Sequence, residues 1–223
     1  MAPIVLAYWD IRGLAQPIRL LLEHVNADWE DKYYICGPAP GFDKTTWFSE
    51  KENLGLPFPN LPYLVDGDVK LVQSGAIIRY LARKHDLLGK TPEEQTRVDL
   101  VDHQINDFRS SFTGMCYNPK FNEMKSNYLE SLPTKLKQFS DYLGDRKFFA
   151  GDNVTFVDFI VYEMLDQHKL LEPTCLDNFQ NLRNFVNNIE SLERIAAYLK
   201  SDKAIKDRLN NRMARFGSGV LAQ

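Results

Sequence analysis

A tyrosine placed between an apolar run and a helical pattern is the residue best suited to chemistry in this chain. The apolar run 4–7 ends on Tyr8, and residues 9–13 (WDIRG) lead into helical spacing. A phenol at this junction, at the tip of a strand, can donate one short hydrogen bond to an anion. The commoner fate of such a tyrosine is to pack its ring at the strand end, and the residues alone leave both explanations open.

Two later segments offer groups that an extended peptide ligand would need. Residues 60–64 (NLPYL) enter a predicted strand, and residues 73–77 (QSGAI) begin a predicted helix. Free amides at a helix start, together with the helix dipole, favour a bound carboxylate. Ser74 could equally serve to cap its own helix.

The elements that must position these groups fall into two kinds. Strands are predicted over 3–8, 29–35, 63–65 and 69–72. Asp66-Gly67 favours a hairpin turn between the last two strands. Apolar residues recur at helical spacing from 14 to 25, with Arg19 and Glu23 on the polar face, and a second helix begins near Ser74. The order is therefore β-α-β followed by β-β-α.

Beyond residue 90 the pattern is helical only. Thr91, Pro92 and Glu94 form a capping box with proline in the first turn. Apolar stripes predict helices over 98–115, over 129–143 with a bend at Pro133, from Thr155, and over 182–189 and 192–199, while 201–223 shows little periodicity. We predict a first domain over 1–85, a linker over 86–90 and an all-helical domain over 91–223.

Composition narrows the class of partner. The 223 residues are 44% hydrophobic and 26% charged, with a net charge of −3, so nucleic acid and anionic membranes are not expected partners. A secretion signal and a membrane-spanning run are both missing, which favours the cytoplasm. The cysteines and histidines are scattered, which predicts neither a disulfide framework nor a metal site. They are Cys36, Cys116, Cys175, His24, His85, His103 and His168.

The segments 8–13, 60–64 and 73–77, with the loop 37–43 (GPAPGFD), Trp47 and Lys51, resemble the mu class of cytosolic glutathione S-transferases. The resemblance covers essentially the whole chain. It implies a thioredoxin-like, glutathione-binding first domain and a helical bundle that completes a site for hydrophobic electrophiles. It also implies a homodimer that acts in detoxification, with glutathione as co-substrate and no metal.

Glutathione carries two carboxylates, one ammonium and a thiol, and the resemblance implies a contact for each. The implied contacts are Tyr8, Trp9, Leu14, Lys44, Trp47, Lys51, Asn60, Leu61, Gln73 and Ser74, with Asp107 reaching across from the partner subunit. Lys44 stands where arginine is frequent in the class, and an acid such as Asp107 could instead be a solvated helix-face residue. The family pattern also implies a cis bond at Pro62 that turns the Leu61 backbone toward the cysteinyl moiety.

Tyr8 is the implied catalytic residue. A thiol with a pKa near 8.5 is only a few per cent ionised at pH 7, and lowering that pKa by about 2 units requires roughly 2.7 kcal/mol. A hydrogen bond to a charged group contributes about 1.5 to 3 kcal/mol. One protonated phenol could therefore account for most of the shift, whereas a tyrosinate base would first have to overcome its own pKa near 10.

The electrophile is expected to be apolar, because the remaining candidates are apolar or aromatic: Ile11, Leu14, Phe112, Met115 and Tyr117. By resemblance, Tyr117 matches a second tyrosine that can donate to an electrophile oxygen. Arg109, Thr113 and Asn211 occupy positions that vary within the class and tune substrate choice. We expect substitution or addition by the thiolate to form a thioether, with the particular substrate undetermined.

Several other residues are expected to be structural. Asp158 lies at capping-box spacing from Thr155 and should fix a helix start. Cys116 and Cys175 are expected in the core and Cys36 at the surface. Phe58, between two prolines, is either packed locally or, as the resemblance implies, inserted between helices of the neighbouring subunit.

Two rival functions remain open from the sequence. A thiol-disulfide oxidoreductase would need cysteine at the first strand-to-helix turn, where this chain has WDIR over 9–12. A non-catalytic carrier of hydrophobic ligands would use the same apolar cleft without activating a thiol.

Overall fold

The computed structural model describes residues 2–219, so Met1 and the last four residues of the predicted helical domain lie outside it. Its strands are β1 (Ile4–Trp9), β2 (Trp29–Tyr34), β3 (Tyr63–Asp66) and β4 (Val69–Val72). They form one sheet in the order β2-β1-β3-β4, in which β1 and β2 are parallel and the other pairs antiparallel. All four predicted strands are confirmed, and Gly67 adopts φ +60° in the turn joining β3 to β4.

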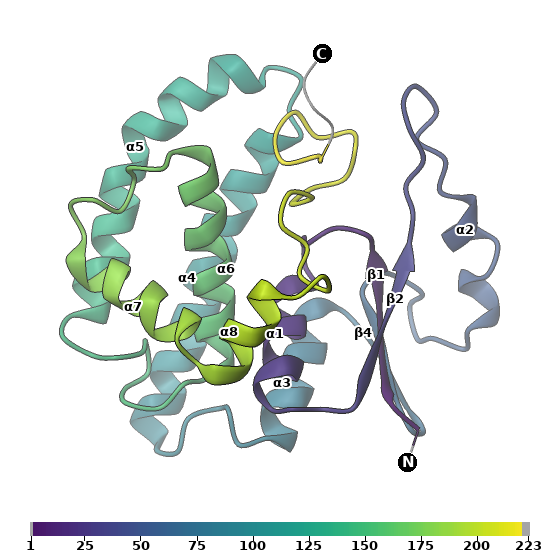
Figure 1. Cartoon of the computed structure of the whole chain (residues 1–223), viewed down its shortest axis with the longest axis horizontal. Helices are drawn as coiled ribbons and strands as arrows, with labels where there is room; N and C mark the ends of the chain where they lie inside the picture. Colours follow the sequence, from purple (N-terminus) through teal and green to yellow (C-terminus); the bar gives the residue numbers. More distant parts are fainter. Residues whose placement is uncertain (1, 220–223) are drawn as a thin grey trace.

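Helices cover both faces of the sheet. Helices α1 (Gln16–His24) and α3 (Ser74–Lys84) lie on the face toward the helical part, and the short α2 (Thr45–Phe48) lies on the other (Figure 1). A single 3₁₀ turn, η1 (Lys51–Asn53), follows α2. These two short pieces were not predicted, because three or four residues are too few to display a helical period.

The rest of the chain folds as five helices within the described residues. They are α4 (Pro92–Cys116), α5 (Phe121–Leu143), α6 (Phe156–Leu171), α7 (Gln180–Glu190) and α8 (Glu193–Lys200). Both predicted capping boxes are present, Thr91 with Glu94 and Thr155 with Asp158. Helix α5 continues through Pro133. The predicted linker over 86–90 falls between α3 and α4, and the domain limits stay a prediction.

Helix α1 is buried on more than its apolar face, because it packs against α3, α6 and α8 as well as lying over the sheet. Arg19, which the sequence pattern places on the polar face, is completely buried. Its guanidinium pairs with Asp31 at 2.6 Å and donates to the Ile11 carbonyl at 2.8 Å. Burial of a charge is tolerated here because it is paired and hydrogen-bonded.

The cysteines correct one expectation. Cys116 is fully buried and Cys175 half-buried, but Cys36 is also buried, so its predicted surface position is wrong. The cause is the loop after β2, which folds back over it: the Gly37 amide bonds the Asp43 carbonyl, and the Cys36 thiol lies 3.8 Å from the Phe42 carbonyl oxygen.

Candidate active site

Tyr8 lies on β1 with its side chain turned into the molecule and only 7% of its surface exposed. Its hydroxyl oxygen accepts a hydrogen bond from the Leu14 amide at 3.3 Å. Burial raises the pKa of this phenol above its ordinary value, and the Leu14 amide and the positive charges of Arg19 and Arg109 offset only part of that rise. Tyr8 is therefore protonated at neutral pH and can act as a donor rather than as a base.

The start of α3 lies next to the turn that follows Tyr8. Gln73 precedes the helix with φ +71° and makes no side-chain cap, so Ser74 is the first helical residue and the capping explanation for Ser74 is not observed. A small cavity of about 50 Å³ brings Ser74 together with Leu14 from the turn before α1 and Arg109 from α4. Three predicted site residues from distant parts of the chain thus converge.

Trp47 is packed into an aromatic cluster and only 4% of its surface is exposed. Its ring stacks on Tyr63 with centroids 6.2 Å apart and meets Tyr34 edge-on at 5.2 Å. Trp9 meets the same Tyr34 edge-on at 6.5 Å. The hydroxyl of Tyr34 also bonds Glu50, which follows α2, so this cluster fixes the α2 segment against the sheet.

Other predicted glutathione contacts come from the segments that flank α2 and from the loop before β3. Lys44 immediately precedes α2, and Lys51 pairs with the exposed Glu52 at 3.3 Å. The Asn60 side chain accepts from the Leu61 amide at 2.8 Å. The Leu61–Pro62 bond is cis, as predicted.

The electrophile candidates differ in how deeply they are buried. Tyr117, at the end of α4, accepts the Asn211 amide at 2.8 Å, and burial raises its pKa to about 12. Ile11 is buried, whereas Thr113 is half-buried on α4. Arg109 donates to Asn106 one helical turn before it.

Two of the electrophile candidates are core residues, so that prediction was wrong for them. Phe112 and Met115 are almost completely buried. Phe112 packs against His168, Tyr128 and Phe216, because the face of α4 that carries it turns toward α5, α6 and the C-terminal segment.

The family model of the glutathione S-transferase N-terminal domain matches residues 4–83 of this chain, and the family model of the C-terminal domain matches residues 106–202. The chain is 52% identical over 218 residues to Glutathione S-transferase Mu 5 of Mus musculus, covering 98% of this chain and 97% of that protein. The chain belongs to the mu class of glutathione S-transferases. Its fold prediction, a thioredoxin-like domain followed by helices, is likewise confirmed.

Further proteins similar to this mu-class transferase are also glutathione S-transferases. Glutathione S-transferase Mu 1 of Homo sapiens is 50% identical over 216 residues, covering 97% of this chain and 99% of that protein. The Pi-class glutathione S-transferase of Onchocerca volvulus superposes with a TM-score of 0.84 at 32% identity, covering 96% of this chain and 100% of that one. The glutathione S-transferase Blo t 8 gives a TM-score of 0.88, also at 32% identity, over 96% and 99% of the two chains.

Sequence reasoning missed a buried ionic group beside the site. Arg12, in the turn after Tyr8, is 6% exposed and pairs with Glu163 and Asp166 on α6. The available signal was an acid in an otherwise apolar stretch of α6, because a charge surrounded by apolar residues needs a partner.

Two absences hold for residues 2–219 of this transferase. No described helix is both long and apolar enough to cross a membrane. Within the same residues, no group of three or more His, Cys, Asp or Glu side chains is placed to hold a metal ion.

Proposed function

We propose that this transferase joins the glutathione thiolate to hydrophobic electrophiles, with the Tyr8 hydroxyl donating a hydrogen bond to the sulfur. The supporting observation is a buried phenol that is protonated at neutral pH and whose hydrogen-bond partner, Leu14, shares a small cavity with the uncapped start of α3. The Leu14 amide donates to the phenol oxygen and so leaves the phenol proton free for the ligand. A donor held in place before the reaction stabilises developing charge without reorganisation.

The proposed glutathione contacts follow the charges of the ligand. The γ-glutamyl carboxylate is held at the start of α3, where Ser74 and Gln73 add hydrogen bonds to the free amides. The ammonium of the γ-glutamyl unit is met by the partner's Asp107; in the described chain Asp107 is an exposed residue of α4. The remaining contacts are Lys44, Trp47 and Lys51 for the glycyl carboxylate, the Leu61 backbone and Asn60 for the cysteinyl unit, and Trp9 and Leu14 beside the sulfur.

The electrophile is proposed to lie beyond Tyr8, against Ile11 and Leu14. The other residues of this proposed electrophile site are Arg109, Thr113, Tyr117 and Asn211. Tyr117 accepts the Asn211 amide, which leaves its own hydroxyl proton free for an electrophile oxygen. The sulfur lone pair forms the new S–C bond, while a leaving group departs with its electron pair or, in an addition, the adjacent carbon later takes up a proton.

The step that every enzymatic version of this proposal requires is ionisation of bound glutathione. Ultraviolet difference spectra of the protein with glutathione across pH should show a thiolate band already near neutral pH. Binding without that band would contradict the proposal and favour a carrier of hydrophobic ligands.

We also infer a homodimer, in which Phe58 of each subunit enters the partner. Phe58 is 86% exposed, although it is an aromatic residue in a proline-flanked loop, so local packing does not account for it. A groove of about 230 Å³ runs between α4 and α5 and offers an apolar receptor site. It is lined by Leu100, Val101, Gln104, Gln138, Phe139 and Tyr142.

Substituting Phe58→Asp should convert the dimer to monomers, because a carboxylate would have to be desolvated in that groove. Sedimentation velocity measures the change directly. Leu100→Asp, within the groove, should have the same effect. Leu170→Asp is the control, since Leu170 is also an exposed apolar residue but lies at the end of α6. A dimer that survives Phe58→Asp would contradict this assignment.

Gly13→Ala should reduce kcat/KM by roughly 10- to 100-fold, the range expected when a reacting group is displaced by about 1 Å. Gly13 has φ +42°, and a Cβ there would lie 2.7 Å from Tyr8 Cε1 and 2.9 Å from its hydroxyl oxygen. The phenol would have to move. Gly114→Ala is the control, because nothing lies within 4 Å of the added methyl group and helix α4 should tolerate alanine. Full activity of Gly13→Ala would show that the phenol position is not critical.

The cytoplasmic location and the absence of a metal requirement stay predictions. Assay of the purified protein after exhaustive chelation, with unchanged turnover expected, checks the second.

A further inference from the structure

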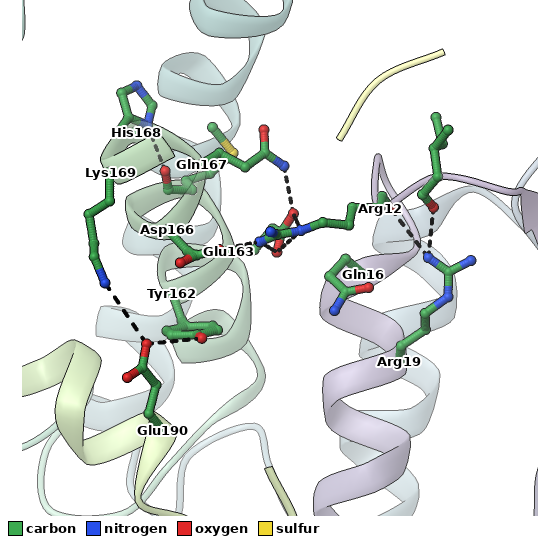
Figure 2. Close-up of polar contacts among 12 residues, drawn as sticks. Arg12, Gln16, Arg19, Tyr162, Glu163, Asp166, Gln167, His168, Lys169 and Glu190 are labelled. Carbon is green, nitrogen blue, oxygen red and sulfur yellow. Dashed lines mark hydrogen bonds and ion pairs between the residues drawn. The ribbon is translucent and has the colours of Figure 1, made fainter. Parts of the chain in front are cut away.

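The turn between Tyr8 and α1 is tied to the helical part of the molecule by a buried arginine. Arg12 lies two residues before Leu14, whose amide donates to the Tyr8 hydroxyl. Its guanidinium points across to α6 (Figure 2). There Nη2 meets Glu163 at 2.6 Å and Asp166 at 2.7 Å, while Nε meets Glu163 at 3.0 Å. Gln167 donates to Glu163 at 2.5 Å and helps to orient that carboxylate.

The backbone of the same turn is held from two other directions. The Arg12 amide donates to the Arg208 carbonyl at 2.7 Å, and the Gly13 amide to the Leu209 carbonyl at 3.0 Å. Arg19 of α1 donates to the Ile11 carbonyl at 2.8 Å. Each of these contacts fixes the backbone, but within residues 2–219 the Arg12 side chain makes the only hydrogen bonds between the turn and α6.

A planar guanidinium that meets a carboxylate through two nitrogens is fixed in orientation as well as in distance. Buried ion pairs add little to stability compared with apolar packing of the same volume, so their presence calls for another explanation. Here the pair acts on the one turn that carries the hydrogen-bond partner of Tyr8. The Leu14 amide is 3.3 Å from the phenol oxygen, beyond the common range for such bonds, so a small shift of the turn would break it.

We propose that Arg12, held by Glu163 and Asp166 of α6, is a positioning residue that sets the Leu14 amide against the Tyr8 hydroxyl and thereby tunes the phenol as a donor to the bound thiolate. This inference rests on the proposed function. Donation by the amide to the phenol oxygen polarises the O–H bond, since hydrogen bonds in a chain strengthen one another. Loosening the turn weakens that donation and lowers the fraction of glutathione that is ionised.

The test is Glu163→Gln, which keeps the shape of the side chain and removes its charge. In the thiolate difference spectrum, the pH at which bound glutathione is half ionised should rise by roughly 0.5 to 1 unit, a three- to tenfold fall in its ionisation constant, as expected for losing about one neutral hydrogen bond. The affinity for glutathione should change less than the ionisation.

The matched control is Asp158→Asn, another buried acid-to-amide change on α6. Asp158 bonds the Phe149 amide and the Thr155 amide and hydroxyl in the first turn of α6, whereas the residues that Arg12 meets lie in the middle of this helix. This variant should lose stability but leave the ionisation of bound glutathione unchanged. An equal shift in both variants would mean that general destabilisation is the cause, and the inference would fail.

Combining Glu163→Gln with Tyr8→Phe separates this inference from the proposed function. If Glu163 acts through Tyr8, the double variant should ionise glutathione like Tyr8→Phe alone, and additive shifts would overturn the inference. No effect of Tyr8→Phe itself would overturn the proposed function instead. If Glu163→Gln fails to fold, Asp166→Asn at the more exposed carboxylate replaces it and should give a smaller shift in the same direction. An unchanged ionisation of bound glutathione in Asp166→Asn would then refute the positioning role of Arg12.

Discussion

Tyr8→Phe is expected to raise the pH at which bound glutathione ionises by roughly 1 to 2 units, and to reduce kcat/KM at neutral pH by roughly 10- to 100-fold. The reason is the loss of one hydrogen bond to a charged sulfur, worth about 1.5 to 3 kcal/mol. The phenol ring stays in place, so packing of β1 against α1 should be preserved. The measurement is the thiolate band across pH, with kcat/KM for a reactive electrophile over the same range.

Tyr117→Phe is the matched control for this experiment. Tyr117 is a half-buried tyrosine beside the proposed site, but its hydroxyl bonds the Asn211 amide rather than the turn at Leu14. The variant should leave the ionisation of glutathione unchanged and slow only electrophiles that present an oxygen to the hydroxyl. A Tyr8→Phe protein that binds glutathione with an unaltered thiolate band would exclude Tyr8 as the donor.

Lowering the pH from 7 to 4 is expected to cost this protein about 3 kcal/mol of unfolding free energy through His168 alone. His168 is completely buried, and its ring stacks on Phe108 with centroids 4.3 Å apart. Nδ1 lies 2.6 Å from the Met164 carbonyl oxygen and Nε2 lies 2.6 Å from the Tyr128 hydroxyl, an arrangement that the neutral ring satisfies. Burial lowers its pKa to about 4, partly offset by the bond to Met164.

The direction of this change in stability follows from the pH at which each state takes up the proton. The unfolded chain protonates this histidine near pH 6.5, whereas the folded protein does so only near pH 4. Between these values the unfolded state binds more protons, so stability falls as the pH falls. The contribution is fully present above about pH 6.5, and its loss levels off below the folded-state pKa.

Denaturant unfolding of the parent protein and of His168→Gln at pH 7 and pH 4 measures this contribution. His168→Gln should start less stable and lose about 3 kcal/mol less than the parent over the interval. His103→Gln, at an exposed position of α4, should follow the parent. Identical losses in the parent and His168→Gln would show that other groups carry the acid sensitivity.

The elements of this fold could be predicted because their signals are local. The capping boxes at Thr91 and Thr155, the Asp66-Gly67 turn and the apolar stripe of α4 each involve residues a few positions apart. Such patterns act through backbone hydrogen bonds and side-chain periods within one element, so the amino-acid sequence by itself determined the strands and the main helices. For the site, resemblance supplied the residue set, which no local pattern would have selected.

The tertiary structure alone decided which side chains meet. Arg12 and Glu163 are 151 positions apart, and only the packing of the turn before α1 on α6 pairs them. Arg19 is buried where it meets Asp31 of β2 and the Ile11 carbonyl. The fold of α4 sends Phe112 into the core, while Tyr117 stays beside the C-terminal segment. Burial depends on what covers a residue from a distant part of the chain, and a helical or strand period states only which residues share a face.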